Sequence, residues 1–416
     1  MEDKTFEQYL DEAFDELEEA ERELDLELLD EDISEEFCFE QTSRDTAILS
    51  LYEGDEETVV VPGQIGGFRV TAIADGAFFM RDKLQTLILP DSVETIRDFA
   101  LQECRALRRL VLPRNLRSLG KMAISGSPLL EKVELPAECE KYVLREGILF
   151  SADGTSLLLC PPAGGLCEYA VPEGVRRIEK QAFNDCTTLQ KVTLPEGLQS
   201  IDELAFSNTG LREVDLPDSL TELGNYAFSS CRHLRRISLG ESLWRINGGC
   251  LAGCCALKEI GLHPLNPALQ LEDGFLLDDT GRVLICAVPG RMRGKVILPH
   301  RIRELEDYAF ASCDRMTHLR LHEDVERIGS CAFGECSALQ KIRIPDKVRE
   351  IGFFTFVDCR ALEEVILNEG LRAISGFAFA GCNALRQVQI HRHTIIECAE
   401  EEATFYDCPA KIELLP

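Results

Sequence analysis

The sequence predicts an α/β solenoid, in which similar coils stack along one axis and share a continuous hydrophobic core. Three observations predict it: apolar residues recur every 23 residues, a short strand pattern accompanies each recurrence, and a proline often follows that strand. The period is clearest at one aromatic position, which is occupied by Phe310, Phe333, Phe356 and Phe379. A chain of 416 residues is too long for one globular core, but the core of a solenoid grows with each added coil.

Residues 1–36 form an acidic extension. They carry -16 of the net charge of -29, because eighteen Asp and Glu residues stand there against only Lys4 and Arg22. The apolar residues among them, such as Phe6, Leu10 and Phe14, follow helical spacing. Two interpretations stay open: a solvated tail that is frayed or disordered, or an amphipathic helix that docks on a partner or on a second copy of the chain. The second interpretation would give self-association through residues 1–36.

Residues 37–76 are expected to form an N-terminal β-hairpin cap. The segments 46–52 and 58–62 are rich in β-branched residues, and residues 53–55 between them have turn character. The end coil of a solenoid exposes an apolar face and an open strand edge. This segment stands where it can cover both.

Regular repeats are expected over residues 77–136, 171–262 and 296–416, the last with a C-terminal cap, which makes about twelve coils. Within a repeat, apolar residues two apart, such as Val192 and Leu194, predict a short strand with one buried face. Pro195 then ends the strand, because proline lacks the N–H that a ladder needs. One repeat buries too little apolar surface to offset the entropy cost of ordering it, so the coils must stack to be stable.

Two elongated coils, residues 137–170 and 263–295, interrupt the period. The interval between equivalent strand positions grows from 23 to 36 residues, from Leu135 to Val171 and again from Leu262 to Leu298. Each elongated coil contains a hairpin pattern, and the first has an Asp-Gly turn at residues 153–154. The two lie 127 residues apart, which indicates that a larger block was duplicated. They are expected to be enlarged coils of one solenoid.

Nine of the eighteen cysteines occupy a single repeat position, where other repeats place Arg81, Ser127 or Thr209. A disulfide-bonded position would not tolerate those replacements. Because cysteine is small and readily buried, and because the chain as written has no secretory signal, the pattern predicts a ladder of reduced thiols inside the coils. Stacked coils lie about 5 Å apart, so geometry alone leaves disulfides between them open. The nine are Cys104, Cys186, Cys231, Cys254, Cys313, Cys336, Cys359, Cys382 and Cys408.

The repeat resembles that of the BspA-like leucine-rich repeat family over about 380 residues. It reads L-x-x-[VI]-x-[LI]-P-x-x-[LV]-x-x-[IL]-x-x-x-A-F-x-x-C-x-x, as in residues 189–209 and 339–360. The resemblance implies a right-handed, horseshoe-like leucine-rich repeat solenoid, with short parallel strands on one face, short helical turns and the two hairpin-bearing elongated coils. It also implies an interaction surface and no catalytic residues, and several relatives are surface proteins that attach to host proteins or other cells.

The candidate partner-binding residues lie on the exposed strand face, because residues on either side of a buried strand residue point outward. A basic cluster there stands out in an acidic protein. It is either an unremarkable surface or a site for an acidic partner. The candidates are His318, Arg320, Lys341, Arg343, Arg236 and Glu364.

The sequence lacks the common catalytic and cofactor motifs, so no enzyme, cofactor or metal site is expected. The acidic balance argues against a nucleic-acid partner, and no apolar run is long enough for membrane insertion. The expected function is a non-enzymatic protein-interaction scaffold. As written the chain has no secretory signal, so a cytoplasmic location is expected. The alternative is a BspA-like surface adhesin exported by another route.

Overall fold

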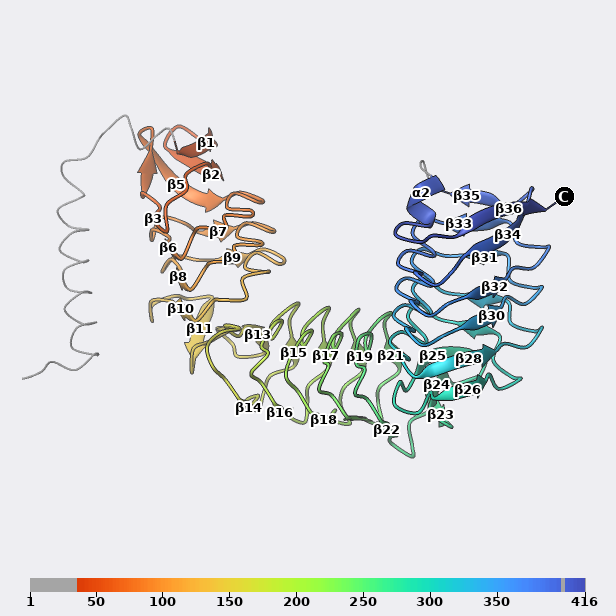
Figure 1. The fold of residues 1–416 in the computed structure, drawn as a ribbon. Helices are drawn as coiled ribbons and strands as arrows, with labels where there is room; N and C mark the ends of the chain where they lie inside the picture. Colours follow the sequence, from red (N-terminus) through yellow and green to blue (C-terminus); the bar gives the residue numbers. More distant parts are fainter. Residues whose placement is uncertain (1–35, 398–400, 416) are drawn as a thin grey trace, which may run out of the picture.

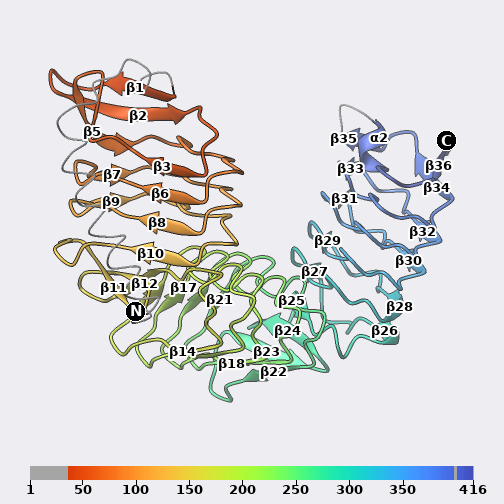
Figure 2. The same ribbon diagram turned by 60° about the vertical axis from the view of Figure 1, so that its left-hand side comes forward.

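The computed structural model describes residues 36–397 and 401–415. The chain forms three stacks of coils, which meet at two corners to make a U (Figures 1 and 2). We call them the first stack (residues 36–135), the middle stack (136–262) and the third stack (263–415). A solenoid is confirmed, and each coil contributes strands to parallel sheets.

Each regular coil has two strands, not one. In the middle stack, β16 (Lys191–Thr193) is followed by β17 (Ser200–Ile201), and each pairs in parallel with its counterpart in the next coil. Val192 and Ile201 are buried, while their neighbours are exposed or half-buried. The expectation of strands on one face is therefore wrong, because a two-residue strand beyond the proline corner builds a second parallel sheet.

The strands of the first stack form two sheets. One sheet contains β3 (Thr58–Val60), β6 (Thr86–Ile88), β8 (Arg109–Val111) and β10 (Lys132–Glu134). The other contains β1 (Phe37–Gln41), β2 (Thr46–Tyr52), β4 (Gln64–Ile65), β5 (Phe68–Ile73), β7 (Thr95–Ile96) and β9 (Ser118–Leu119).

The middle stack repeats this arrangement. One sheet contains β14 (Glu168–Ala170), β16, β18 (Glu213–Asp215), β20 (Arg236–Leu239) and β22 (Glu259–Leu262), which run along the outer side of the base of the U (Figure 1). The other contains β11 (Tyr142–Arg145), β12 (Ile148–Ser151), β13 (Ser156–Leu159), β15 (Arg177–Ile178), β17, β19 (Glu222–Leu223) and β21 (Arg245–Ile246).

The third stack has four sheets. The longest contains β23 (Leu269–Glu272), β24 (Phe275–Asp278), β25 (Val283–Ala287), β27 (Glu304–Leu305) and β29 (Arg327–Ile328). The second contains β26 (Gly294–Ile297), β28 (Met316–Arg320), β30 (Lys341–Arg343) and β32 (Glu364–Ile366). The last two are β31 (Glu350–Ile351), β33 (Ala373–Ser375) and β35 (Ile395–Glu397), and the pair β34 (Gln387–His391) and β36 (Lys411–Leu415).

The third side of each coil is a double turn, and the expectation of helical turns is wrong. In one such turn Gln181 and Asp185 have φ of 58° and 62°, in the left-handed region, on either side of Ala182 and Phe183. The Phe183 N–H donates to the carbonyl of Ala205 in the next coil at 2.7 Å, where a helix would bond within its own turn. Among the described residues the only helix is α2 (Glu401–Thr404), on the inner side of the U (Figure 1).

The core is built around the predicted aromatic column. Phe356 stacks on Phe333 with ring centroids 5.1 Å apart, and on Phe379 at 5.3 Å. The cysteine position lies beside this column and is buried in every coil but the last, where Cys408 is half-buried, and the described cysteines are free thiols. Cys336 Sγ donates to the carbonyl of Phe310 in the preceding coil, at 3.2 Å. The thiol thus satisfies a buried acceptor that an apolar side chain would leave unpaired.

The N-terminal strands are present, but their predicted pairing is wrong. β2 pairs in antiparallel fashion with β1, not with β3. β3 instead joins β6 in parallel, as the first strand of the other sheet. The connection between β2 and β3 thus crosses from one side of the coil to the other. The expected interactions of residues 1–36 lie outside the described residues.

The two elongated coils are the corners of the U. At the first corner β12 pairs in antiparallel fashion with β11 and β13, and at the second β24 pairs in the same way with β23 and β25. The hydrophobic core divides at the same places, into one cluster for each stack. The hairpins therefore turn the solenoid.

Candidate functional site

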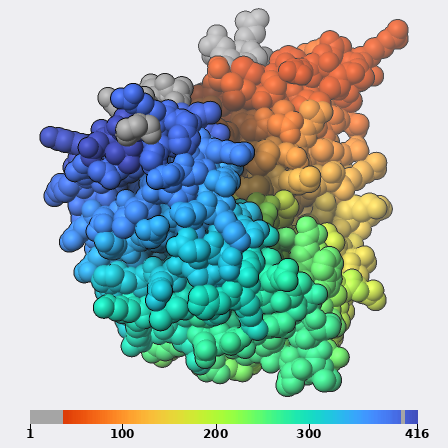
Figure 3. Space-filling model, turned by 90° about the vertical axis from the view of Figure 1, so that its right-hand side faces the viewer, coloured from red at the N-terminus to blue at the C-terminus, as the bar shows by residue number. Residues whose placement is uncertain are grey.

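The predicted basic cluster lies on adjacent parallel strands of the third stack. His318 of β28 pairs with Lys341 of β30, and Lys341 pairs with Glu364 of β32. Lys341 Nζ lies 2.7 Å from a carboxylate oxygen of Glu364, and both side chains are about half exposed. Figure 3 views the molecule from the third-stack side, with the first stack behind it. The strand pairing brings these three candidates together as one row.

The remaining candidates divide between two sheets. Arg320 and Arg343 are exposed at the ends of β28 and β30, and Arg343 Nε lies 3.9 Å from Glu323. Arg236 belongs to β20 in the middle stack, where it forms ion pairs with Asp215 at 3.0 Å and Glu259 at 4.0 Å. We therefore define the basic face as His318, Arg320, Lys341 and Arg343, and Arg236 lies outside it.

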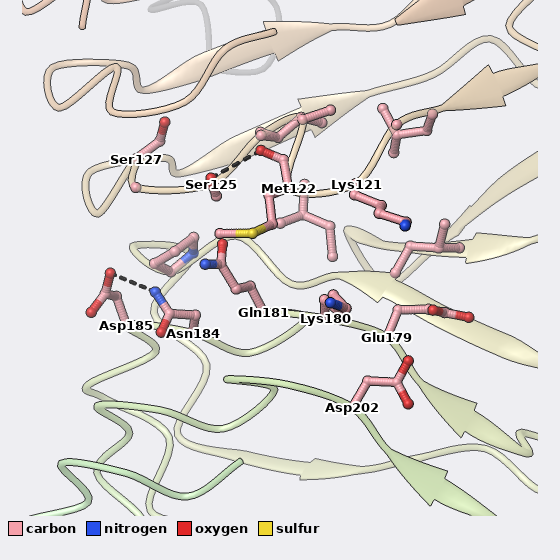
Figure 4. Close-up of a pocket in the computed structure, with 18 of the residues that line it drawn as sticks. Lys121, Met122, Ser125, Ser127, Glu179, Lys180, Gln181, Asn184, Asp185 and Asp202 are labelled. Carbon is pink, nitrogen blue, oxygen red and sulfur yellow. Dashed lines mark hydrogen bonds between the residues drawn. The ribbon is translucent and has the colours of Figure 1, made fainter. Parts of the chain in front are cut away.

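A cavity of about 310 Å³ opens at the first corner, where the turns of the first and middle stacks meet. In Figure 4, Gln181 extends from the middle stack toward Met122 of the first stack. Ile124, Leu158 and Leu159 contribute apolar walls. This size lies at the lower end of the range of small-ligand sites, which runs from about 300 to 1,000 Å³.

Some polar groups of this corner pocket have a hydrogen-bond or ion-pair partner, and one has none. Burial raises the pKa of Glu179, whose carboxylate accepts a hydrogen bond from Ser156 Oγ at 2.9 Å. Burial also raises the pKa of Asp202, although Arg177 lies 3.7 Å away. Within the described part of the chain Gln181 Oε1 is buried without a hydrogen-bond partner. The wall of the pocket therefore encloses an unused acceptor beside apolar side chains.

One group of side chains that could hold a metal ion was missed from the sequence, where no metal site was expected. Ligand atoms of Asp218, Glu241 and His263 lie within 4.8 Å of one another in the described residues. Each comes from a successive coil, one to three residues after the end of its strand. Only alignment of the repeats would have found this spacing. The Leu265 N–H donates to Nδ1 of His263 at 3.3 Å, so one ring nitrogen is already engaged.

Parallel strands on two sides, a double turn on the third and a central aromatic column define the class of protein, a leucine-rich repeat solenoid. The chain belongs to the BspA type leucine rich repeat family, whose repeats match residues 69–144, 165–268 and 294–411 in six copies. The resemblance found in the sequence is thus confirmed. Members of this fold class are typically non-enzymatic interaction proteins.

Comparison with solved structures finds one with a TM-score above 0.5, which shares the fold. A leucine rich cell surface protein from Faecalibacterium prausnitzii is 23% identical, with 91% of this chain and 93% of that chain covered and a TM-score of 0.53. A leucine-rich repeat protein from Bacteroides ovatus is also 23% identical, with 94% and 100% covered and a TM-score of 0.35. No sequence among the curated proteins matches the chain. Within the described residues, no helix has the length and apolar character to cross a membrane.

Proposed function

We propose that the protein is a non-enzymatic protein-interaction module that binds an acidic partner through the basic face. The carrying observation is the parallel pairing of β28 with β30, which holds the cationic side chains in fixed register on a rigid sheet. Adjacent strands lie about 4.8 Å apart, so acidic groups of an extended partner can meet them in sequence. Family membership supports this role, since leucine-rich solenoids commonly act in protein binding.

Neighbouring carboxylates influence how strongly the basic face binds an acidic partner. Glu364 accompanies Lys341 and Glu323 accompanies Arg343. Exposed ion pairs of this kind contribute about 0–1 kcal/mol, so an acidic partner can replace either carboxylate at low cost. Binding should therefore be fast and should weaken as salt concentration rises.

The test is charge reversal with Arg320→Glu and Arg343→Glu, which leaves Lys341 and Glu364 intact. The control is Lys191→Glu, an exposed charge reversal on strand β16 of the middle stack, outside the basic face. Partners cross-linked to the native protein at low salt are compared by mass spectrometry. The double variant should lose acidic partners that the control retains. Recovery of the same partners by both variants would move the site elsewhere.

The alternative, a surface adhesin, is supported by the description of the F. prausnitzii neighbour as a cell surface protein. No observation favours the cytoplasmic location. Treatment of intact host cells with an added protease distinguishes the two, since only a surface protein is cleaved while a cytoplasmic marker survives.

We also propose self-association through residues 1–36, whose 18 acidic residues could meet the basic face of a second copy. Light scattering should then show fewer chains per particle after deletion of residues 1–36. An unchanged number of chains per particle would exclude this contact.

A further inference from the structure

The two corners are copies of one another. Residues of the second corner lie 127 positions after their equivalents in the first, so Met122 corresponds to Gly249 and Gln181 to Tyr308. Both corners have an antiparallel strand trio and a pocket lined by equivalent turns. Residue differences at equivalent positions therefore account for the difference between the two pockets.

The second corner is closed by two tyrosines of its own. The hydroxyl groups of Tyr226 and Tyr308 are hydrogen bonded at 2.8 Å, and their rings meet edge to face with centroids 5.4 Å apart. Gly249 permits this contact, because a Cβ there would lie 2.5 Å from Cε1 of Tyr226 and 3.2 Å from Cδ2 of Tyr308. The cavity that is left measures about 60 Å³.

The first corner lacks this internal plug. Met122 stands where the second corner has Gly249, and Gln181 stands where it has Tyr308. The cavity is about 310 Å³, against 60 Å³ in the copy. The amide of Gln181 reaches into this space toward Met122 (Figure 4), and its Oε1 has no partner among the described residues. A buried acceptor without a donor costs free energy that a ligand can recover.

We propose that the first corner is a socket for a tyrosine side chain of a protein partner. The ring packs on Ile124, Leu158 and Leu159, and the phenol hydroxyl donates a hydrogen bond to the enclosed Oε1 of Gln181 once Met122 has moved aside. The same chain uses a phenol to fill the equivalent place in its second corner. Met122 is a suitable movable wall, because an unbranched thioether adapts its shape at little cost. This inference rests on the proposed function in one respect: the tyrosine is supplied by a protein partner.

The first experiment uses N-acetyl-L-tyrosinamide as the probe, so it needs no identified partner. We expect saturation-transfer NMR to detect its ring protons, with a dissociation constant of about 1 mM, which is reasonable for a ligand of this size. N-acetyl-L-phenylalaninamide lacks the hydroxyl and should bind about fivefold to tenfold more weakly. Equal binding of the two amides, or stronger binding of an alkylamine of similar size at the same site, would overturn the proposal.

Substitutions at the two corners test whether the tyrosine amide binds in the first-corner pocket. The double variant Met122→Gly, Gln181→Tyr rebuilds the plug of the second corner and should abolish binding. The single variant Gln181→Leu replaces the amide with an apolar side chain and should bind both amides equally. This variant provides the test if the double variant folds poorly. Tyr308→Gln, which removes the plug from the other corner, should leave the first socket's affinity unchanged. Unchanged binding to Gln181→Leu, with the preference for the hydroxyl retained, would contradict the assignment.

One further variant separates this inference from the proposed function. The double charge reversal of Arg320 and Arg343 should retain binding of the tyrosine amide, since those side chains lie in the third stack. Loss of acidic partners with an intact socket would support both assignments independently. Loss of the amide in this variant would contradict the location at the first corner.

Discussion

Leu149 and Phe150 are neighbours in strand β12, yet they belong to two different hydrophobic cores. Leu149 packs in the cluster of the first stack, and Phe150 packs in the cluster of the middle stack. Side chains alternate across a strand, so a strand buried on both sides joins two cores. In β24 of the second corner, Leu276 packs with the middle stack and Leu277 with the third.

This arrangement predicts separable effects of two adjacent substitutions. Leu149→Ala should destabilise the first stack, and Phe150→Ala the middle stack, by about 2–5 kcal/mol each. Hydrogen exchange measured by mass spectrometry should show faster exchange mainly in residues 37–135 for the first variant. For the second it should show faster exchange mainly in residues 156–260. Identical exchange patterns would mean that the three stacks unfold as one unit.

The aromatic column predicts a large cost for its middle members. Phe356 is completely buried between Phe333 and Phe379. Phe356→Ala should lower the free energy of unfolding by about 3–5 kcal/mol, because it removes packing and leaves a cavity. Phe353→Ala is the matched control three residues earlier. Its side chain is 52% exposed, so its effect in urea denaturation should be much smaller.

The thiol column predicts a sharp division in cysteine reactivity. Burial raises the pKa of Cys336 from its ordinary value of 9.0 to about 12, and that of Cys104 likewise to about 12. Cys167 and Cys255 are exposed. At pH 8 iodoacetamide should modify these two in the native protein and reach the buried column only after unfolding. Fast native labelling of Cys336 would contradict its burial.

The same pKa shifts predict a loss of stability in alkali. A thiol whose pKa is higher in the folded than in the unfolded protein binds its proton more tightly when folded. The stabilisation is therefore fully present below about pH 9 and is lost as the pH rises toward about 12. Urea denaturation at pH 8, 9.5 and 11 should show this decline. Cys336→Ser, whose hydroxyl does not ionise in this range, should show a smaller one.

The second corner predicts a steric cost at Gly249. Its φ of 67° already disfavours a side chain, and an added methyl would meet the rings of Tyr226 and Tyr308. Gly249→Ala should therefore cost more than the roughly 1 kcal/mol expected from the backbone alone. Gly165→Ala supplies that reference, because Gly165 has φ of 74° and open space around it. Equal melting temperatures for the two variants would disprove the clash.

Much of the fold could be predicted from repetition alone. The 23-residue spacing of Phe310, Phe333 and Phe356 leads directly to the column, and the 36-residue intervals locate the hairpins. The double turns were mistaken for helices because left-handed residues such as Gln181 are not glycines, and bonds to the next coil are not visible in a local pattern. The pairing of β2 failed for the same reason, since its partner is chosen across the stack.

The candidate binding residues were predictable only as positions on a strand face. Their sequence order gives the cluster of His318 and Lys341, but not the ion pairs that reduce its charge. The corner pocket was not foreseen, because it needs side chains from two stacks to meet. The sequence did contain one signal for it: Gln181 stands where the second corner has Tyr308.

The amino-acid sequence by itself determined the repeating coil, because every coil obeys the same local requirement to bury one face and end its strand. Tertiary structure alone decided that the stack bends twice and that the two bends differ. Those outcomes depend on contacts between residues more than 80 positions apart, such as Tyr226 and Tyr308. No single repeat contains the information for packing across a corner.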